Sequence, residues 1–462
     1  MKDGKTGVFY TIKRAFQDGS KATKLSFFSM GAGQCLQRRF GKGVLYLVVQ
    51  LAFTLFMSFG GFKALLALFS GNLGTRLSGE VWNEQLQIFE KVRGDNSFLI
   101  LLYGVASVLI LVAYLLCWYS NVKDAYAADL AFRQGESPLT FREEFVRLWD
   151  EKFHLPLLSL PLIGLLVFTV LPLVFMVLIA FTNYDYAHMP PGKLFNWVGL
   201  DNFKALFSLS GGTSSFASVF LRVLLWTFVW AFLATFSNYF IGLLFALAIN
   251  RKGIKGKVVF RTLFVLAIAV PQFVSLLLMQ KILDGDGILN KILGTEILWL
   301  TDQRYFSLLP RLMILLVNIW VGVPYTILMS TGLLLSIPTD YFEAAKIDGA
   351  SAFKAFVHIT LPYMLQLTTP YLITQFVTNI NNFNVIWLLT GGGPVDNLYY
   401  GGGTQAQSTD LLVTWLYRLT TDKNPRYNVA AVIGIVIFVI CVTASLIVYG
   451  RSSAAKAEED FQ

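Results

Sequence analysis

Charged residues are scarce in this chain. Asp, Glu, Lys and Arg make up 14% of its 462 residues, whereas 55% of the residues are hydrophobic. A soluble globular domain carries about 25% charged residues, so the composition excludes an ordinary soluble domain. The apolar residues also gather into runs of about 20 residues or more, which is the length that crosses a bilayer.

Eight such runs are present, and they predict an all-α polytopic membrane protein with about eight transmembrane helices. They lie at 44–61, 98–119, 155–182, 219–249, 258–283, 308–337, 363–390 and 429–449. Residues 1–154 combine a basic tail, two spans and a polar loop. Residues 155–450 hold six spans with short connections, and 451–462 form a tail.

Histidine and cysteine are also rare, with three of each. They stand in separate segments and show no metal-binding or redox spacing. They are His154, His188, His358, Cys35, Cys117 and Cys441. A phosphate-binding GxxxxGK[ST] loop is missing as well, since the "GKT" at 4–6 lacks the upstream glycine. We therefore expect no metal, no cofactor and no ATP hydrolysis on this chain, which is not an enzyme.

The predicted spans lack paired acidic residues, which a proton- or sodium-driven carrier usually needs. A secondary transporter is therefore the weaker alternative. Uncharged amides take their place, at Asn318, Gln366, Gln375, Asn379, Asn381, Asn382 and Asn384. Amides of this kind either bind a neutral ligand or hydrogen-bond neighbouring helices.

The net charge of +9 does not indicate a nucleic-acid partner. If the N-terminus is cytoplasmic, the segments 1–43, 119–154, 250–261, 337–362 and 450–462 are inside, and they hold most of the 37 Lys and Arg residues. This is the positive-inside pattern. It predicts a multi-pass protein of the cell membrane with both termini in the cytoplasm. The first apolar run is interpreted as an anchor, because some forty residues precede it and no signal-peptide cleavage pattern follows.

Two polar segments interrupt this apolar pattern. In the loop 119–154, Thr140 and Glu143 have the spacing of a capping box, which predicts a helix pair lying against the membrane. The second segment, "YFEAAKIDGASAFKAFVHITLP" (341–362), predicts a helix–turn–helix. Asp340 and Glu343 have a cap-like spacing, Gly349 permits the turn and Pro362 suits the first turn of the next span. It forms either a partner-docking site or an amphipathic surface loop.

Two further clusters are candidates for substrate contacts. In "NIWVGVPY" (318–325), Pro324 is expected to kink the helix, so that Trp320 and Tyr325 flank a local break beside Gly322. The alternative is a packed, kinked span with interfacial aromatic residues.

In "QFVTNINNFN" (375–384), Gln375, Asn379 and Asn382 are spaced four and three apart, which places them on one helical face. Amides both donate and accept hydrogen bonds without charge, so this face suits a neutral polyhydroxyl ligand. Asn384 is expected to point away from it.

The 341–362 segment also carries a resemblance. Glu343-Ala344-Ala345, then Gly349 and Ile359, then Leu361-Pro362, is similar to the "EAA" motif of permease subunits of ATP-binding-cassette (ABC) importers. The resemblance implies a six-helix type I importer core and a loop that enters a groove on a separate ATPase. It assigns coupling to Glu343, Ala344, Ala345, Asp348, Gly349, Ile359, Leu361 and Pro362.

Other stretches narrow the resemblance to carbohydrate importers, and to the MalF-type permeases of maltose/maltodextrin systems. They are "FTVLPLVFMVLIAFTNYD" (168–185), "WVGLDNF" (197–203), "NNFNVIWLLTGGGP" (381–394) and "TDLLVTWLYRL" (409–419). The chain departs from the enteric members in having only a loop at 183–218, where they carry a folded domain. It also has Thr378 where some members have an aromatic residue.

The resemblance implies a permease that moves maltodextrin-type oligosaccharide by alternating access. It implies sugar contacts at Trp320, Gly322, Tyr325, Asn379 and Asn382, to which the helical face adds Gln375. It also implies a second permease as heterodimer partner, two ATPases that bind ATP and magnesium, and an extracellular sugar-binding protein. A galacto-oligosaccharide or another plant oligosaccharide is the alternative substrate. A membrane glycosyltransferase would need acidic pairs or a nucleotide-sugar loop, and the sequence shows neither.

Overall fold

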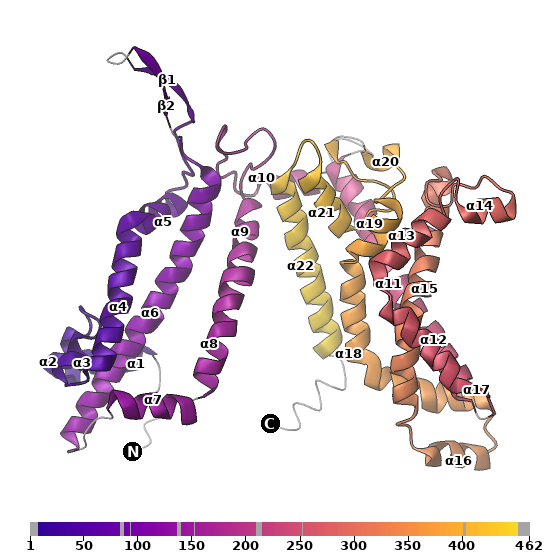
Figure 1. The fold of residues 1–462 in the computed structure, drawn as a ribbon, viewed down its shortest axis with the longest axis horizontal. Helices are drawn as coiled ribbons and strands as arrows, with labels where there is room; N and C mark the ends of the chain where they lie inside the picture. The colour runs from indigo at the N-terminus through magenta and orange to yellow at the C-terminus, as the bar shows by residue number, and fades with distance from the viewer. Residues whose placement is uncertain are drawn as a thin grey trace. The chain divides into compact units, whose positions relative to one another are not determined.

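The computed structural model describes residues 8–83, 87–92, 94–135, 140–151, 153–208, 215–251, 253–400 and 403–450. The chain divides into two compact units, Met1–Gly199 and Leu200–Gln462 (Figure 1). The predicted tail 451–462 lies outside the described residues.

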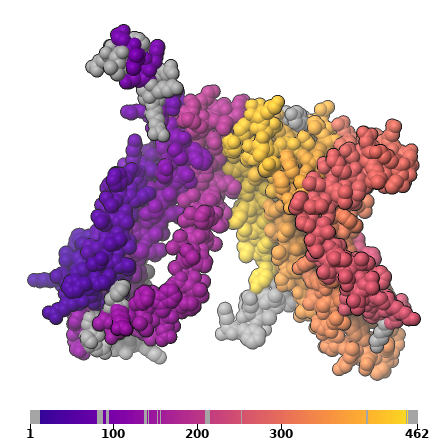
Figure 2. Space-filling model, in the orientation of Figure 1, coloured from indigo at the N-terminus to yellow at the C-terminus, as the bar shows by residue number. Residues whose placement is uncertain are grey.

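Unit 1 contains three long apolar helical segments with shorter elements at their ends. Its elements are α1 (Val8–Asp18), α2 (Lys21–Leu25), α3 (Ala32–Leu36), α4 (Phe40–Phe56), the π-helical η1 (Met57–Gly61), α5 (Phe62–Phe69), β1 (Gly79–Asn83), β2 (Ile88–Val92), α6 (Ser97–Arg133), α7 (Phe141–Asp150), α8 (His154–Leu165), η2 (Leu166–Val170) and α9 (Leu171–Ile179). The antiparallel β1–β2 hairpin projects from one end of the unit (Figures 1 and 2).

In its described residues, unit 2 is built from helices joined by turns and loops. Its elements are α10 (Asp201–Phe207), α11 (Phe216–Asn250), α12 (Lys257–Ala269), α13 (Gln272–Ile282), α14 (Ile288–Leu293), α15 (Arg304–Leu334), α16 (Thr339–Ile347), α17 (Ala352–Ala355), η4 (Phe356–Thr360), α18 (Leu361–Ile380), α19 (Phe383–Thr390), α20 (Asn397–Tyr400), α21 (Leu412–Thr421) and α22 (Tyr427–Gly450).

The prediction of a helical polytopic membrane protein is confirmed, with the β1–β2 hairpin as an unpredicted exception and an approximate number of spans. Six helical segments among the described residues are long and apolar enough to cross a membrane. They are Phe40–Phe69, Ser97–Arg133, Pro156–Ile179, Phe216–Asn250, Ser307–Leu334 and Tyr427–Ile447. The fifth predicted run becomes α12 and α13, which are bent by 91° at the break before Pro271 and count as a seventh span if taken together.

The seventh predicted run, 363–390, is divided between α18 and α19 and is not among these segments. α18 carries Gln366, Gln375 and Asn379, and these polar side chains reduce its hydropathy. Pro362 occupies the first turn of α18, as predicted.

The polar loop after the second predicted span begins as a continuation of α6, which runs without interruption to Arg133. Within the following α7, the predicted capping box is present. The backbone N–H of Thr140 donates to Glu143 Oε2 at 2.8 Å, and the backbone N–H of Glu143 donates to Thr140 Oγ1 at 3.4 Å. Residues 136–139 between the two helices lie outside the described residues.

The core of unit 2 forms where α11 packs on α15 and α19. Trp230 and Ala234 of α11 contact a cluster that includes Ile314, Val317 and Val385, all of which are buried. At the next level Gly242 lies so close to Thr326 that an added Cβ would fall 2.6 Å from the threonine Cβ. α11 and α15 are therefore closely packed, and α18 packs against this pair.

Candidate functional site

A pocket of about 240 Å³ lies between α11, α15 and α18. Its lining residues are Ala234, Thr235, Asn238, Gly322, Tyr325, Thr326, Tyr371, Gln375 and Asn379. Four of the predicted sugar contacts, from two distant segments of the sequence, therefore meet in one place. The wall carries amides, hydroxyls and aromatic rings, and the rings of Tyr325 and Tyr371 stack with their centroids 6.0 Å apart.

Trp320 is not part of this pocket. It lines a larger groove of about 840 Å³, together with Tyr325, Gly322 and the hinge between α12 and α13. Its side chain is 54% exposed. α15 runs as one helix from Arg304 to Leu334 with Pro324 inside it, so the helix is not interrupted beside Trp320, and the kink at Pro324 stays a prediction.

The prediction that Gln375, Asn379 and Asn382 share one helical face is wrong for Asn382. α18 ends at Ile380, and Asn382 is the N-cap of α19, where its Oδ1 accepts from the backbone N–H of Val385 at 3.2 Å. The expected position of Asn384 assumed the same regular helix and fails for the same reason. An asparagine that caps a new helix satisfies the first backbone donors and so favours a break in the chain.

Asn379 is buried and its side chain is fully engaged within unit 2. Its Nδ2 donates to Thr235 Oγ1 at 3.0 Å, and its Oδ1 accepts from Asn382 Nδ2 at 3.3 Å. Its backbone carbonyl accepts from Trp230 Nε1 at 3.1 Å. In this conformation Asn379 and Asn382 connect helices, whereas Gln375 lines the pocket and makes no side-chain hydrogen bond to the described residues.

Asn238 was not among the residues predicted from the sequence to contact the substrate. It lines the pocket from α11, and its Oδ1 is buried without a hydrogen-bond partner among the described residues. It also explains Gly322, since a Cβ at that position would lie 2.3 Å from Asn238 Nδ2. The signal that selected the other intramembrane amides applies equally to Asn238, which stands inside the apolar run 219–249.

The predicted helix–turn–helix after α15 is present, at one end of unit 2 (Figure 1). α16 and α17 are its two helices, and Gly349 between them has φ of +71°, a conformation that favours glycine. The predicted cap at Asp340 is wrong, because α16 already begins at Thr339 after Pro338, and Asp340 lies inside its first turn. Ser351 caps α17 by accepting from the backbone N–H of Lys354 at 3.3 Å.

This helix–turn–helix presents a largely exposed surface. Glu343 and Ala344 are exposed and Ala345 is half-buried, while Ile347 and Phe353 are 87% and 74% exposed. Ile359 and Leu361 are half-buried at the root of α18, and Pro362 and Asp348 are exposed. Apolar side chains this exposed on α16 and α17 form a surface suited to a protein partner.

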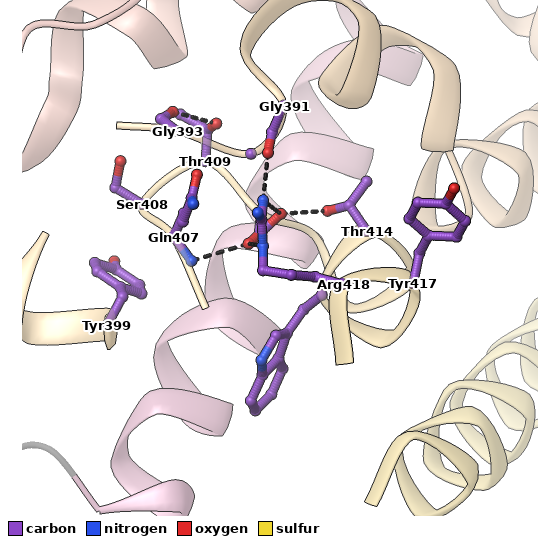
Figure 3. Close-up of polar contacts among 12 residues, drawn as sticks. Gly391, Gly393, Tyr399, Gln407, Ser408, Thr409, Thr414, Tyr417 and Arg418 are labelled. Atoms are coloured by element: carbon purple, nitrogen blue, oxygen red, sulfur yellow. Dashed lines mark hydrogen bonds and ion pairs between the residues drawn. The ribbon is translucent and has the colours of Figure 1, made fainter. Parts of the chain in front are cut away.

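At the opposite end of unit 2, the segment between α19 and α21 folds around a buried ion pair (Figure 3). Arg418 Nε lies 3.2 Å from Asp410 Oδ2, and Arg418 also donates to the carbonyl of Gly391. Thr414 Oγ1 and the backbone N–H of Gln407 each donate to Asp410 at 2.9 Å. Burial raises the pKa of Asp410, and the neighbouring guanidinium lowers it. The two motifs around 381–394 and 409–419 are thus joined into one structure.

The described residues contain no group of three or more His, Cys, Asp or Glu side chains that could hold a metal ion.

Comparison with known proteins gives the family. Residues 238–455 match the family described as "Binding-protein-dependent transport system inner membrane component". The "Maltodextrin transport system permease protein MalC" of Streptococcus pneumoniae is 34% identical over 457 residues, which is 96% of this chain and 98% of that protein. The "Galactooligosaccharides transport system permease protein GanP" of Bacillus subtilis is 33% identical over 93% of this chain and 96% of its own length.

Among solved structures, a bacterial alginate ABC transporter in complex with a pentasaccharide-bound periplasmic protein is similar in fold. One of its chains aligns with a TM-score of 0.50 and 22% identity, over 66% of this chain and 97% of its own. The chain therefore belongs to the binding-protein-dependent transport family, as a multi-pass inner-membrane permease subunit of an ABC importer and not an enzyme.

Proposed function

We propose that this permease subunit carries maltose or maltodextrin-type oligosaccharide across the cell membrane. The observation that supports this substrate class is the pocket between α11, α15 and α18, which combines uncharged amides with tyrosine rings. Amides and hydroxyls match sugar hydroxyls in both donor and acceptor roles. The similar S. pneumoniae protein is a maltodextrin permease, and it covers nearly the whole chain.

The sugar contacts in this proposal are Gly322, Tyr325, Gln375 and Asn379 in the pocket, with Trp320 in the adjoining groove. Asn382 joins them once its hydrogen bond to Asn379 opens. Since Asn379 and Asn382 are engaged with each other, sugar binding must exchange that contact for one to a sugar hydroxyl. The side chain of Gln375 has no hydrogen bond to a described residue that must break first, so it can bind a sugar hydroxyl directly.

The proposed coupling site is the α16–α17 surface, which would dock on a cytoplasmic ATPase. Glu343, Ala344, Ala345, Asp348, Gly349, Ile359, Leu361 and Pro362 would transmit its closure. The complete transporter would comprise this chain, a second permease, two ATPase subunits that bind ATP and magnesium, and an extracellular sugar-binding protein. Both termini would be cytoplasmic, and residues 155–450 would supply the six-helix core.

The runner-up substrate is a galacto-oligosaccharide or another plant oligosaccharide, which the similarity to the B. subtilis permease favours. A secondary carrier is not retained, since the family works with a binding protein. Uptake of labelled maltotriose by cells that carry or lack this chain tests the substrate. We expect uptake of the label that depends on this chain, and poor competition by unlabelled galactotriose. No chain-dependent uptake of labelled maltotriose, with chain-dependent uptake of labelled galactotriose, would replace the first substrate with the second.

A further inference from the structure

α2 and α3 form a short helical hairpin that lies along α6 in unit 1. The first arm follows α6 by one hydrogen bond at each turn. The backbone N–H of Ser20 donates to Asp129 Oδ2 at 2.8 Å, and Thr23 Oγ1 donates to the carbonyl of Ala125 at 3.3 Å. Next, Asn121 Nδ2 donates to the carbonyl of Ser26 at 2.9 Å, and Trp118 Nε1 to the carbonyl of Phe27 at 3.0 Å. The arm therefore runs from the level of Asp129 to the level of Trp118.

The second arm returns along the same helix. The backbone N–H of Gly31 donates to Asn121 Oδ1 at 2.9 Å, Gln34 Nε2 to the carbonyl of Asn121 at 2.9 Å and Gln37 Nε2 to that of Ala125 at 2.9 Å. Arg39 then pairs with Asp124 at 3.1 Å. The hairpin tip thus points toward the apolar part of α6, and Figure 1 shows α2 and α3 beside that helix.

Two glycines permit this close packing. Gly31 has φ of +80°, and a Cβ there would lie 2.0 Å from the carbonyl oxygen of Gly43 in α4. A Cβ on Gly33 would lie 2.0 Å from Ser26 Oγ in the opposite arm. The hairpin is therefore held against α6 by buried hydrogen bonds and packs closely on α4 at Gly43.

The tip, residues 27–30, extends along α4 to a residue well inside its apolar sequence. Gln50 Oε1 accepts from the backbone N–H of Met30 at 2.7 Å, and Gln50 Nε2 donates to the carbonyl of Phe28 at 3.3 Å. Gln50 is ten residues from the start of α4, which corresponds to about 15 Å along a helix. At this level the side chain of Phe28 is 80% exposed.

The arms of the hairpin carry exposed positive charge. Lys21, Lys24 and Arg38 are exposed, while the acids Asp124 and Asp129 beside them are engaged with Arg39 and Arg133. An apolar tip with basic residues behind it is the charge pattern of a segment lying in a membrane interface.

We propose that residues 20–39 form a lipid-binding wedge, which inserts the tip 27–30 among the acyl chains and binds anionic phospholipid headgroups through Lys21, Lys24 and Arg38. In the proposed orientation this is the cytoplasmic leaflet. The wedge would seat the cytoplasmic end of α6 in the bilayer, and it does not depend on which sugar is transported.

Site-directed fluorescence in nanodiscs tests the depth of the tip. In a background with Cys35, Cys117 and Cys441 replaced by serine, the assembled transporter is labelled at Phe28→Cys. Gln17→Cys on α1 serves as the aqueous control and Leu115→Cys as the in-bilayer control. We expect position 28 to resemble position 115, with quenching by doxyl-labelled acyl chains and protection from iodide. Iodide quenching equal to that of position 17, or protection from both quenchers by a protein partner, would overturn the proposal.

Lipid counting by native mass spectrometry tests the charges. The triple variant Lys21→Glu/Lys24→Glu/Arg38→Glu is compared with the matched control Lys281→Glu/Lys291→Glu/Lys423→Glu, whose lysines are exposed in unit 2. We expect the first triple to lose phosphatidylglycerol by several-fold and the control to retain it. Equal retention in both triples would contradict headgroup binding at the wedge.

Discussion

Asp410 and Arg418 form an ion pair in which Asp410 is 1% exposed and the side chain of Arg418 is 14% exposed. Gly392 approaches the same carboxylate so closely that a Cβ there would lie 2.0 Å from Asp410 Oδ1. The pair therefore holds the chain between α19 and α21 in one conformation, at the end of unit 2 remote from α16 and α17.

Arg418→Met is expected to destabilise unit 2 by about 3–5 kcal/mol, because it leaves the Asp410 carboxylate buried without its cation. Thermal unfolding of the purified complex measures the loss. The matched control is Lys204→Met, which breaks the exposed pair with Asp201 and should leave the unfolding temperature unchanged. Equal effects in the two variants would mean that the buried pair contributes no more than a surface pair.

Gly349→Asp is expected to abolish uptake and coupled ATP hydrolysis while the subunit still inserts and assembles. Apart from its two neighbours in the sequence, no described residue lies within 4 Å of a Cβ added at Gly349, so a loss must come from the partner surface or from the backbone conformation. Gly294→Asp separates these causes, since Gly294 has the same left-handed conformation and the same open surroundings outside the motif. The docking role fails if Gly294→Asp loses transport to the same extent as Gly349→Asp.

Gln375→Ala and Asn379→Ala are expected to weaken sugar binding at the transport site by about 1–3 kcal/mol each, which is roughly five- to 150-fold in affinity. The two variants should differ in their thermal stability. Asn379→Ala also removes the donor to Thr235 Oγ1 and the acceptor of Asn382 Nδ2 and should lower the unfolding temperature, whereas Gln375→Ala should not. The concentration dependence of maltotriose uptake measures the first effect and thermal unfolding the second.

Asn384→Ala is the control for both, because Asn384 is exposed and is not a pocket residue. If all three variants transport equally well, the amides serve only to connect helices.

Cysteine labelling is expected to place the α16–α17 surface inside the cell and the loop after α9 outside. Ile347→Cys is a suitable inner reporter, because Ile347 is 87% exposed. Gly192→Cys suits the outer loop, whereas the neighbouring Phe195 is fully buried and would not react on either side. An impermeant reagent added to whole cells should modify position 192 and not position 347. The reverse pattern would invert the topology.

The spans could be predicted from the sequence because hydrocarbon selects for apolar runs of a fixed length. Each predicted run corresponds to one continuous helical segment or, at 258–283 and 363–390, to two successive helices. Local conformations could also be predicted from the sequence where a single residue determines them, as at the turn at Gly349 and the helix cap at Thr140. Helix ends were less predictable. Asn382 continues the helical spacing of Gln375 and Asn379 in the sequence, yet it caps a new helix instead.

Tertiary contacts could not be predicted from the sequence pattern. Asn238 lies close to Gly322, 84 positions away, and the sequence around either residue does not indicate this contact. The wedge of α2 and α3 likewise depends on hydrogen bonds to α6 about ninety residues away, as between Gly31 and Asn121. Sequence spacing shows which side chains share an element, but not which elements meet.

The most direct test of the proposed function is transport by the purified complex in proteoliposomes, with the sugar-binding protein outside and ATP enclosed. We predict accumulation of maltotriose that requires both ATP and the binding protein and persists when an ionophore collapses ion gradients. We also predict that Gln375→Ala raises the maltotriose concentration needed while ATP hydrolysis remains coupled. Uptake that continues without ATP, or that is unchanged by Gln375→Ala and selects a sugar other than a maltodextrin, would contradict it.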